Sequence, residues 1–130
     1  MILKLYSELL SASLKEFRQI IESGEMLYTQ NGQPWKIRFY LNDKSLQDVY
    51  CSASGKYSYH WDQSVTTGRI YRHDNAPHKK WRDIKTFPKH FHDGSEETVK
   101  ESHLPDDAAA ALKKFLLYIK EHIRKNEDIS

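Results

Sequence analysis

The chain has 130 residues, which is the usual size of one domain, and 38% of them are hydrophobic and 12% aromatic. This composition excludes an integral membrane protein and an intrinsically disordered chain. The net charge of +2 is too small to indicate nucleic-acid binding by itself. The charge is uneven, because residues 69–92 hold seven Lys or Arg and two Asp, whereas the rest holds 13 basic and 16 acidic residues. Segment 69–92 is therefore the first candidate for a functional region.

Cysteine content and hydropathy limit the class of protein further. Cys51 is the single cysteine, so an intramolecular disulfide and a four-cysteine zinc site are both excluded. The N-terminal residues lack the apolar core of a secretory signal, and no apolar run approaches the roughly 20 residues that span a bilayer. We expect a cytoplasmic, soluble protein that forms one domain over residues 1–130 and has no membrane partner.

Residues 13–24 are predicted to form the first helix. The Ser13 hydroxyl can accept a hydrogen bond from the third amide of the helix while Glu16 reaches back, as in a capping box. Gly24 would end the helix. The apolar positions within it follow a helical period: Leu14, Phe17, Ile20 and Ile21.

An antiparallel meander of about five strands is predicted next. Turn residues separate five runs of strand-forming residues, which span 26–30, 35–41, 45–52, 57–63 and 69–73. In the fourth run Tyr57, Tyr59 and Trp61 alternate with polar residues, so one face of that strand is aromatic. We interpret this aromatic face as core; a base-stacking platform is the alternative.

The remaining third of the chain is predicted to hold a long loop, a short strand and a helix. Residues 74–88 lose the strand period and form a basic loop longer than ordinary connections. The second helix should begin at residues 104–107, with Pro105 in an early turn and Asp106 and Asp107 near the positive end of the helix dipole, and fray over 125–130. Its apolar stripe contains Leu112, Phe115, Leu116, Ile119 and Ile123. The predicted fold class is therefore α+β: N-terminal helix, meander sheet, basic loop with a short strand, C-terminal helix.

The alternation of side chains along an extended strand predicts which side chains of the basic segment share a face. In an extended segment His90 and His92 lie on one face and Phe91 points to the other, toward the core. In the preceding strand Arg69, Tyr71 and His73 share one face, and Arg72 and Asp74 share the other. If the two strands pair, imidazoles and a guanidinium converge.

Such a set favours metal-independent cleavage of an RNA phosphodiester, with no cofactor. One imidazole would take the proton of a ribose 2′-hydroxyl, a second would protonate the leaving oxygen, and cations would stabilise the phosphorane. The candidate catalytic residues are His90, His92, His78 and His73, with Asp74 orienting an imidazole. The candidate phosphate-binding residues are Arg69, Arg72, Lys79 and Lys89.

Three alternatives are left open. The first is a zinc-dependent hydrolase in which His90 and His92, with His78 or His73, supply nitrogen ligands, and Asp74 is a ligand or the hydrogen-bond partner of one. The second is a non-catalytic module that binds RNA or a protein partner through the basic loop. The third is that these histidines are solvent-facing or structural, which is the interpretation we adopt for three others: His60, His103 and His122.

The sequences RHDNAPH at 72–78 and TFPKHFHDG at 86–94 resemble the TumE-type toxins of bacterial and archaeal toxin–antitoxin pairs. The resemblance includes Asp74, Asn75 and the His90–His92 pair. The chain departs from the family pattern at His73, where an aromatic residue, tyrosine, is expected before the Asp-Asn pair.

The resemblance implies a small toxin that acts on RNA and is neutralised by a cognate antitoxin protein encoded beside it. It covers about 20 residues, and the order of strands followed by a helix agrees with it. The RNA class, any cut-site preference and the oligomeric state, a homodimer included, are left open by the sequence.

Overall fold

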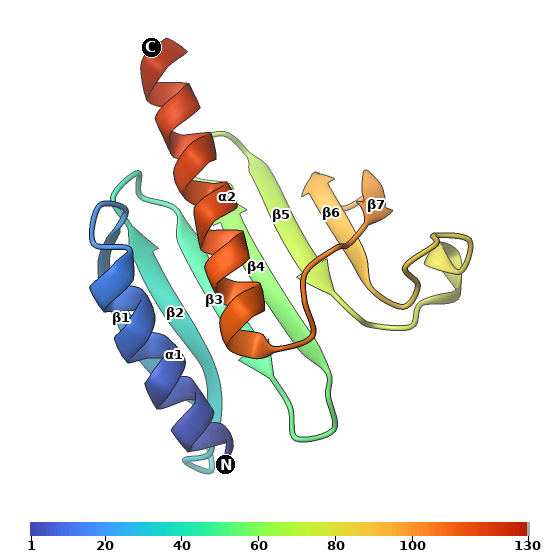
Figure 1. Cartoon of the computed structure of the whole chain (residues 1–130), viewed down its shortest axis with the longest axis horizontal. Coiled ribbons are helices and arrows are strands. Elements are labelled where there is room, and N and C mark those ends of the chain that lie inside the picture. The colour runs from blue at the N-terminus through green and yellow to red at the C-terminus, as the bar shows by residue number, and fades with distance from the viewer. Residues whose placement is uncertain (130) are drawn as a thin grey trace.

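The computed structural model describes residues 1–129, which form a seven-stranded antiparallel sheet with two α-helices. The strands follow one another in chain order, so the sheet is a simple meander (Figure 1). In chain order the elements are α1 (Ile2–Glu16), β1 (Ile21–Tyr28), β2 (Pro34–Leu41), β3 (Leu46–Cys51), β4 (Tyr57–Gln63), β5 (Arg69–Asp74), the 3₁₀ turn η1 (Lys79–Trp81), β6 (His90–Gly94), β7 (Val99–Glu101) and α2 (Ala108–Ile129). The predicted α+β class is confirmed.

Both helices lie against the same face of the sheet, which we call the helix face (Figure 1). The core lies there because every second residue of the central strands points toward the helices and is buried. The predicted stripe of α2 is confirmed: Leu112, Phe115, Leu116, Ile119 and Ile123 are all buried. The aromatic face of β4 belongs to this core, as predicted: Tyr59 and Trp61 are buried in it, and Tyr57 is partly buried and packs against it. The opposite face, called the open face, carries polar and charged residues.

The prediction for the first helix was wrong. The helix spans Ile2–Glu16, and Ser13 is a buried residue of its last turns; the N-cap position is held by Met1. Its buried face is formed by Tyr6, Leu9 and Ser13, at helical spacing. The apolar period continues past the helix end because Phe17 and Ile20 are buried in the turn that follows. A short apolar run does not distinguish a helix from the turn and strand that replace it here.

Gly24, predicted to end that helix, lies inside β1 instead. A Cβ atom at this position would meet Leu10 Cδ1 and Phe39 Cδ1 at 2.9 Å each. The glycine is therefore explained by the close approach of α1 and β2 to the β1 backbone. Gly24 was therefore correctly singled out in the sequence, but it indicates tight packing and not the end of a helix.

The sheet is larger than predicted and the last helix is longer. The predicted short strand is β6, and β7 was not predicted because Val99–Glu101 is brief and lacks apolar alternation. The α2 helix continues to Ile129, past the point where fraying was expected, and Ser130 lies outside the described residues. No helix among the described residues combines the length and apolar character needed to cross a bilayer.

Candidate functional site

The pairing of β5 with β6 decides which side chains share the open face. The register places Arg72 opposite His92 and Asp74 opposite His90. Because side chains alternate along a strand, these four residues project from the open face. His73 is opposite Phe91, so both project to the helix face. The predicted convergence of imidazoles with a guanidinium is therefore found, with Arg72 as the cation.

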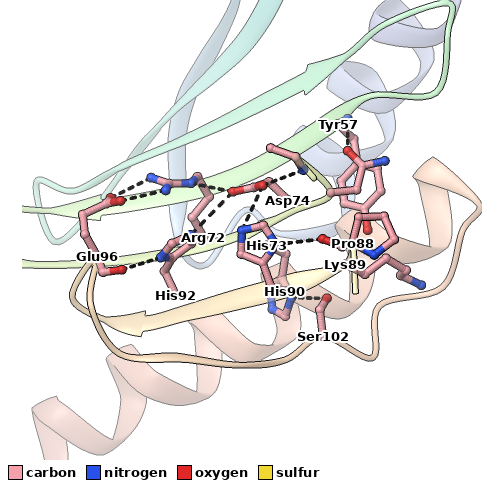
Figure 2. Close-up of polar contacts among 12 residues, drawn as sticks. Tyr57, Arg72, His73, Asp74, Pro88, Lys89, His90, His92, Glu96 and Ser102 are labelled. Carbon is pink, nitrogen blue, oxygen red and sulfur yellow. Dashed lines mark hydrogen bonds and ion pairs between the residues drawn. The ribbon is translucent and has the colours of Figure 1, made fainter. Parts of the chain in front are cut away.

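Asp74, His90 and His92 form a compact group that we call the cluster (Figure 2). Nε2 of His90 lies 3.2 Å from Oδ1 of Asp74, and Nε2 of His92 lies 3.7 Å from Oδ2. All three residues are buried, His90 completely and His92 with 3% exposed. Other side chains therefore shield the cluster almost completely from solvent.

The other nitrogen of each ring fixes the tautomer. Nδ1 of His90 contacts the Pro88 carbonyl oxygen at 2.8 Å, and Nδ1 of His92 contacts the Glu96 carbonyl oxygen at 2.8 Å. A carbonyl oxygen only accepts, so both Nδ1 atoms donate and carry the proton. Each neutral ring therefore keeps an unprotonated Nε2, directed at the Asp74 carboxylate. Burial lowers the pKa of His92, so the neutral ring is favoured at neutral pH.

Arg72 joins the cluster to the turn between β6 and β7. Its Nε donates to Asp74 Oδ2 at 2.9 Å, and its terminal nitrogens donate to the two Glu96 carboxylate oxygens at 2.7 and 2.8 Å. Burial acts to lower the pKa of Arg72, but the hydrogen bonds to both carboxylates outweigh it and the pKa is raised. Arg72 is therefore committed to two carboxylates within the protein.

A cleft of about 710 Å³ lies over the cluster, between the open face and the loop 75–89. Trp81 of η1 covers the two rings, with centroids 6.2 Å from His90 and 5.9 Å from His92. Asn75 ties the loop to the β3–β4 hairpin, because its Oδ1 accepts from the Tyr57 amide and its Nδ2 donates to the Gly55 carbonyl. The further lining residues include Tyr50, Lys56, Ser58, Pro77, His78, Lys80 and Glu97.

The structure brings together only part of the predicted site. His90, His92, Asp74 and Arg72 meet at the floor of the cleft, and His78 lies exposed in its lining. The remaining four predicted site residues, His73, Arg69, Lys79 and Lys89, do not line it. The Lys89 ammonium instead donates to the Leu104 carbonyl at 2.7 Å and to Asp106 at 3.1 Å.

His73 has the surroundings of a packing residue. Its ring stacks on Phe91 with centroids 4.1 Å apart and an interplanar angle of 10°, and its Nδ1 is 2.7 Å from Ser102 Oγ. Burial, and then the charge of Lys114, lowers the pKa of His73 to about 3. A partly buried, neutral ring that stacks on Phe91 can fill the place of the aromatic residue that the resemblance led us to expect here.

Sequence reasoning missed several cleft residues. Glu96 carried no signal, because it lies in a polar turn and contributes through both its carboxylate and its backbone. Trp81 could have been noticed as the one tryptophan within the basic segment. Lys56 and Tyr57 come from the β3–β4 hairpin, and only the folded sheet brings them to the cleft.

One donor set in the described residues has the composition of a metal site. One carboxylate oxygen of Asp74 and one nitrogen from each of His90 and His92 lie within 4.8 Å of one another. Of the predicted zinc ligands, His90, His92 and Asp74 belong to this set, and neither His78 nor His73 does.

Comparison with protein-family models matches residues 10–123 to the family described as Toxin TumE. Comparisons with curated proteins and with solved structures gave no significant match. The matched range covers most of the chain and includes the cluster, Arg72 and the loop over the cleft. The chain therefore belongs to the TumE family, the toxins of toxin–antitoxin pairs, which implies an antitoxin as its partner.

Proposed function

We propose that this toxin is a ribonuclease that cleaves phosphodiester bonds of cytoplasmic RNA in the cleft over Asp74, His90 and His92. The observation that carries the proposal is the cluster itself: two buried imidazoles with one fixed tautomer converge on a buried carboxylate at the floor of a cleft. Buried titratable groups that converge in a cleft are typical of catalytic sites.

The surroundings of the cleft suit a ribonucleotide chain. Tyr50 and Trp81 in the lining contribute aromatic surface on which bases can stack. The loop that forms one wall carries four exposed cations against one exposed carboxylate: Lys79, Lys80, Arg82 and Lys85 against Asp83. Within the lining itself cations and carboxylates are balanced, so attraction for phosphate comes mainly from this loop.

The geometry supports a different division of roles from the one predicted. An acid and a base must reach opposite sides of the reacting phosphate. Here both rings use Nδ1 for a backbone carbonyl and aim Nε2 at the same carboxylate. We therefore treat the cluster as one unit and assign proton transfer at the rim to His78, which is exposed in the lining. Acid–base catalysis by His90 and His92 alone is the rival mechanism.

The test compares two carboxylate-to-amide changes on the same strand ladder. Asp74→Asn removes the charge of the cluster, whereas Asp93→Asn changes a carboxylate on the helix side that pairs with Lys100. With toxin purified free of antitoxin, we expect Asp74→Asn to lower RNA cleavage by at least about 100-fold and Asp93→Asn to leave it unchanged. Growth arrest on expression should follow the same order.

Two results would overturn the proposal. One is a wild-type toxin that arrests growth but leaves every class of cellular RNA intact. The other is full cleavage by Asp74→Asn. If that variant does not fold by circular dichroism, His92→Gln takes its place, because it keeps the size of the buried side chain and removes the imidazole.

A further inference from the structure

The cluster presents a problem of donors and acceptors. With Nδ1 committed as a donor in each ring, each neutral Nε2 is an acceptor, and it faces carboxylate oxygens that also only accept. Among residues 1–129, Nε2 of His90 has no hydrogen-bond partner, although the side chain is completely buried. A buried polar atom without a partner is destabilising, so something positive must lie between these groups.

Protons alone resolve the problem poorly. One proton on one ring satisfies that ring and leaves the other lone pair facing a carboxylate. Protons on both rings would place two cations with ring centroids 5.0 Å apart, next to Arg72. One cation bound by all three side chains satisfies every acceptor at once.

The distances suit a small metal ion. Ligand atoms around a tetrahedral ion at about 2.0–2.1 Å are roughly 3.3 Å from one another. Nε2 of His90 lies 3.2 Å from Oδ1 of Asp74 and Nε2 of His92 lies 3.7 Å from Oδ2, so each ring nitrogen is near that separation from one oxygen of the same carboxylate. One carboxylate oxygen and one nitrogen from each ring lie within 4.8 Å of one another, so the set is compact enough for one ion to draw the three side chains together.

The hydrogen bonds behind the rings also match a metal site. A metal-bound imidazole almost always donates its other N–H to a carbonyl or carboxylate, which fixes the ring and its tautomer. His90 and His92 do this through Pro88 and Glu96. The nearest cation, Arg72, is already paired with both Glu96 oxygens, so its charge is largely offset.

From these observations we propose that Asp74, His90 and His92 bind one divalent transition-metal ion through a carboxylate oxygen and two Nε2 atoms. Two imidazoles and one carboxylate are the ligands of zinc-class and iron-class sites, and magnesium, which prefers oxygen ligands, is disfavoured. Binding of the ion does not depend on the proposed function, whereas a part in RNA cleavage rests on it. There the ion would supply Lewis-acid chemistry beneath the bound phosphate.

The experiment uses the full chain without a histidine tag, freed of metal by chelation and dialysis. Zn²⁺ binding is measured by calorimetry, and Co²⁺ is added to look for the visible absorption of an ion held by nitrogen and oxygen ligands. We expect one ion for each chain and no competition from Mg²⁺. His92→Gln and Asp74→Asn should weaken Zn²⁺ binding at least about tenfold, whereas His103→Gln, which alters an exposed His–Glu pair, should not.

Folding and function are kept separate by two further readouts. Zn²⁺ should raise the melting temperature of the wild type and of His103→Gln but not of the cluster variants. A metal-free wild type that binds neither Zn²⁺ nor Co²⁺, or binding that survives both cluster substitutions, would overturn the metal site. RNA cleavage that persists undiminished in metal-free protein would overturn its catalytic part and favour acid–base catalysis. Zn²⁺ binding by a toxin that leaves RNA intact would support the proposed metal site and contradict the proposed ribonuclease activity.

Discussion

On the helix side of the β5–β6 ladder, His73 stacks on Phe91 beneath α2 and is held neutral by burial. On the open side, one residue away along each strand, His90 and His92 converge on Asp74. All three rings are buried or nearly so, but only the open-side pair has a carboxylate aimed at it. The difference shows that the layer covering a histidine and the residues on the partner strand, more than the histidine itself, decide whether the ring packs in the core or forms part of a site.

The largest effect that separates the two sides should come from Phe91→Ala. This change removes the ring that His73 stacks on and leaves a cavity beside Tyr118. Because Phe91 is only partly buried, we expect the free energy of unfolding to fall by about 3 kcal/mol, the low end for such a truncation. Urea denaturation measures this. RNA cleavage for each folded molecule should persist, and its loss would show that the two sides are not separable.

The next effect is a pH dependence that belongs to the helix side. The pKa of His73 is about 3 in the fold, against about 6.5 for a free histidine, so the unfolded state binds a proton first as the pH falls. The stability due to the neutral ring is complete above about pH 6.5 and is lost as the pH falls toward 3. At pH 5 the loss is roughly 2 kcal/mol.

His73→Phe should abolish this part of the acid sensitivity. Comparison of urea denaturation at pH 7 and pH 5 should show a stability difference smaller by roughly 2 kcal/mol than in the wild type. Phe91→Leu disturbs the same stack without removing a titratable group, so it should keep the wild-type difference. Equal pH dependence in His73→Phe and wild type would contradict the assignment.

A smaller effect should follow from Glu96→Gln on the open side. The amide cannot balance the Arg72 guanidinium, but the backbone carbonyl that accepts from His92 is retained. Because the Glu96 side chain is 54% exposed, water screens the pair and we expect a stability loss of about 1 kcal/mol. Zn²⁺ binding should be kept. Glu97→Gln, also in the cleft lining, is the matched control. An equal loss of stability in that variant would show that the ion pair with Arg72 is not the cause.

The smallest effect should come from the loop cations. The double change Lys79→Gln and Lys80→Gln should weaken binding of a non-cleavable RNA a few-fold. It should also reduce the slope of log affinity against log salt by roughly 1.4, or 0.7 for each charge. Fluorescence anisotropy across a salt series measures both quantities. Lys120→Gln, on α2 across the sheet, should leave the slope unchanged; a similar reduction there would make the effect one of overall charge.

How much of the molecule the sequence predicted depended on the length and regularity of each pattern. The apolar stripe of α2 and the strands β2 to β5 have regular apolar periods, and they were predicted closely. The first helix was misplaced because Phe17 and Ile20 extend its apolar period into a turn. For the site, parity alone put His90 and His92 on one face with Phe91 on the other, and this is confirmed.

By itself the sequence determined the α+β class, the resemblance to TumE-type toxins and the pairing of His90 with His92 on one strand face, because each is a local pattern. Only the tertiary structure decided that Asp74 and Arg72, rather than His73 and Arg69, meet those rings. Glu96 and Trp81 likewise reach the cleft only once a turn and a loop fold back over the sheet. The physical reason is that strand register and loop path depend on packing between residues distant in the chain. The local periodicity of apolar residues does not contain that information.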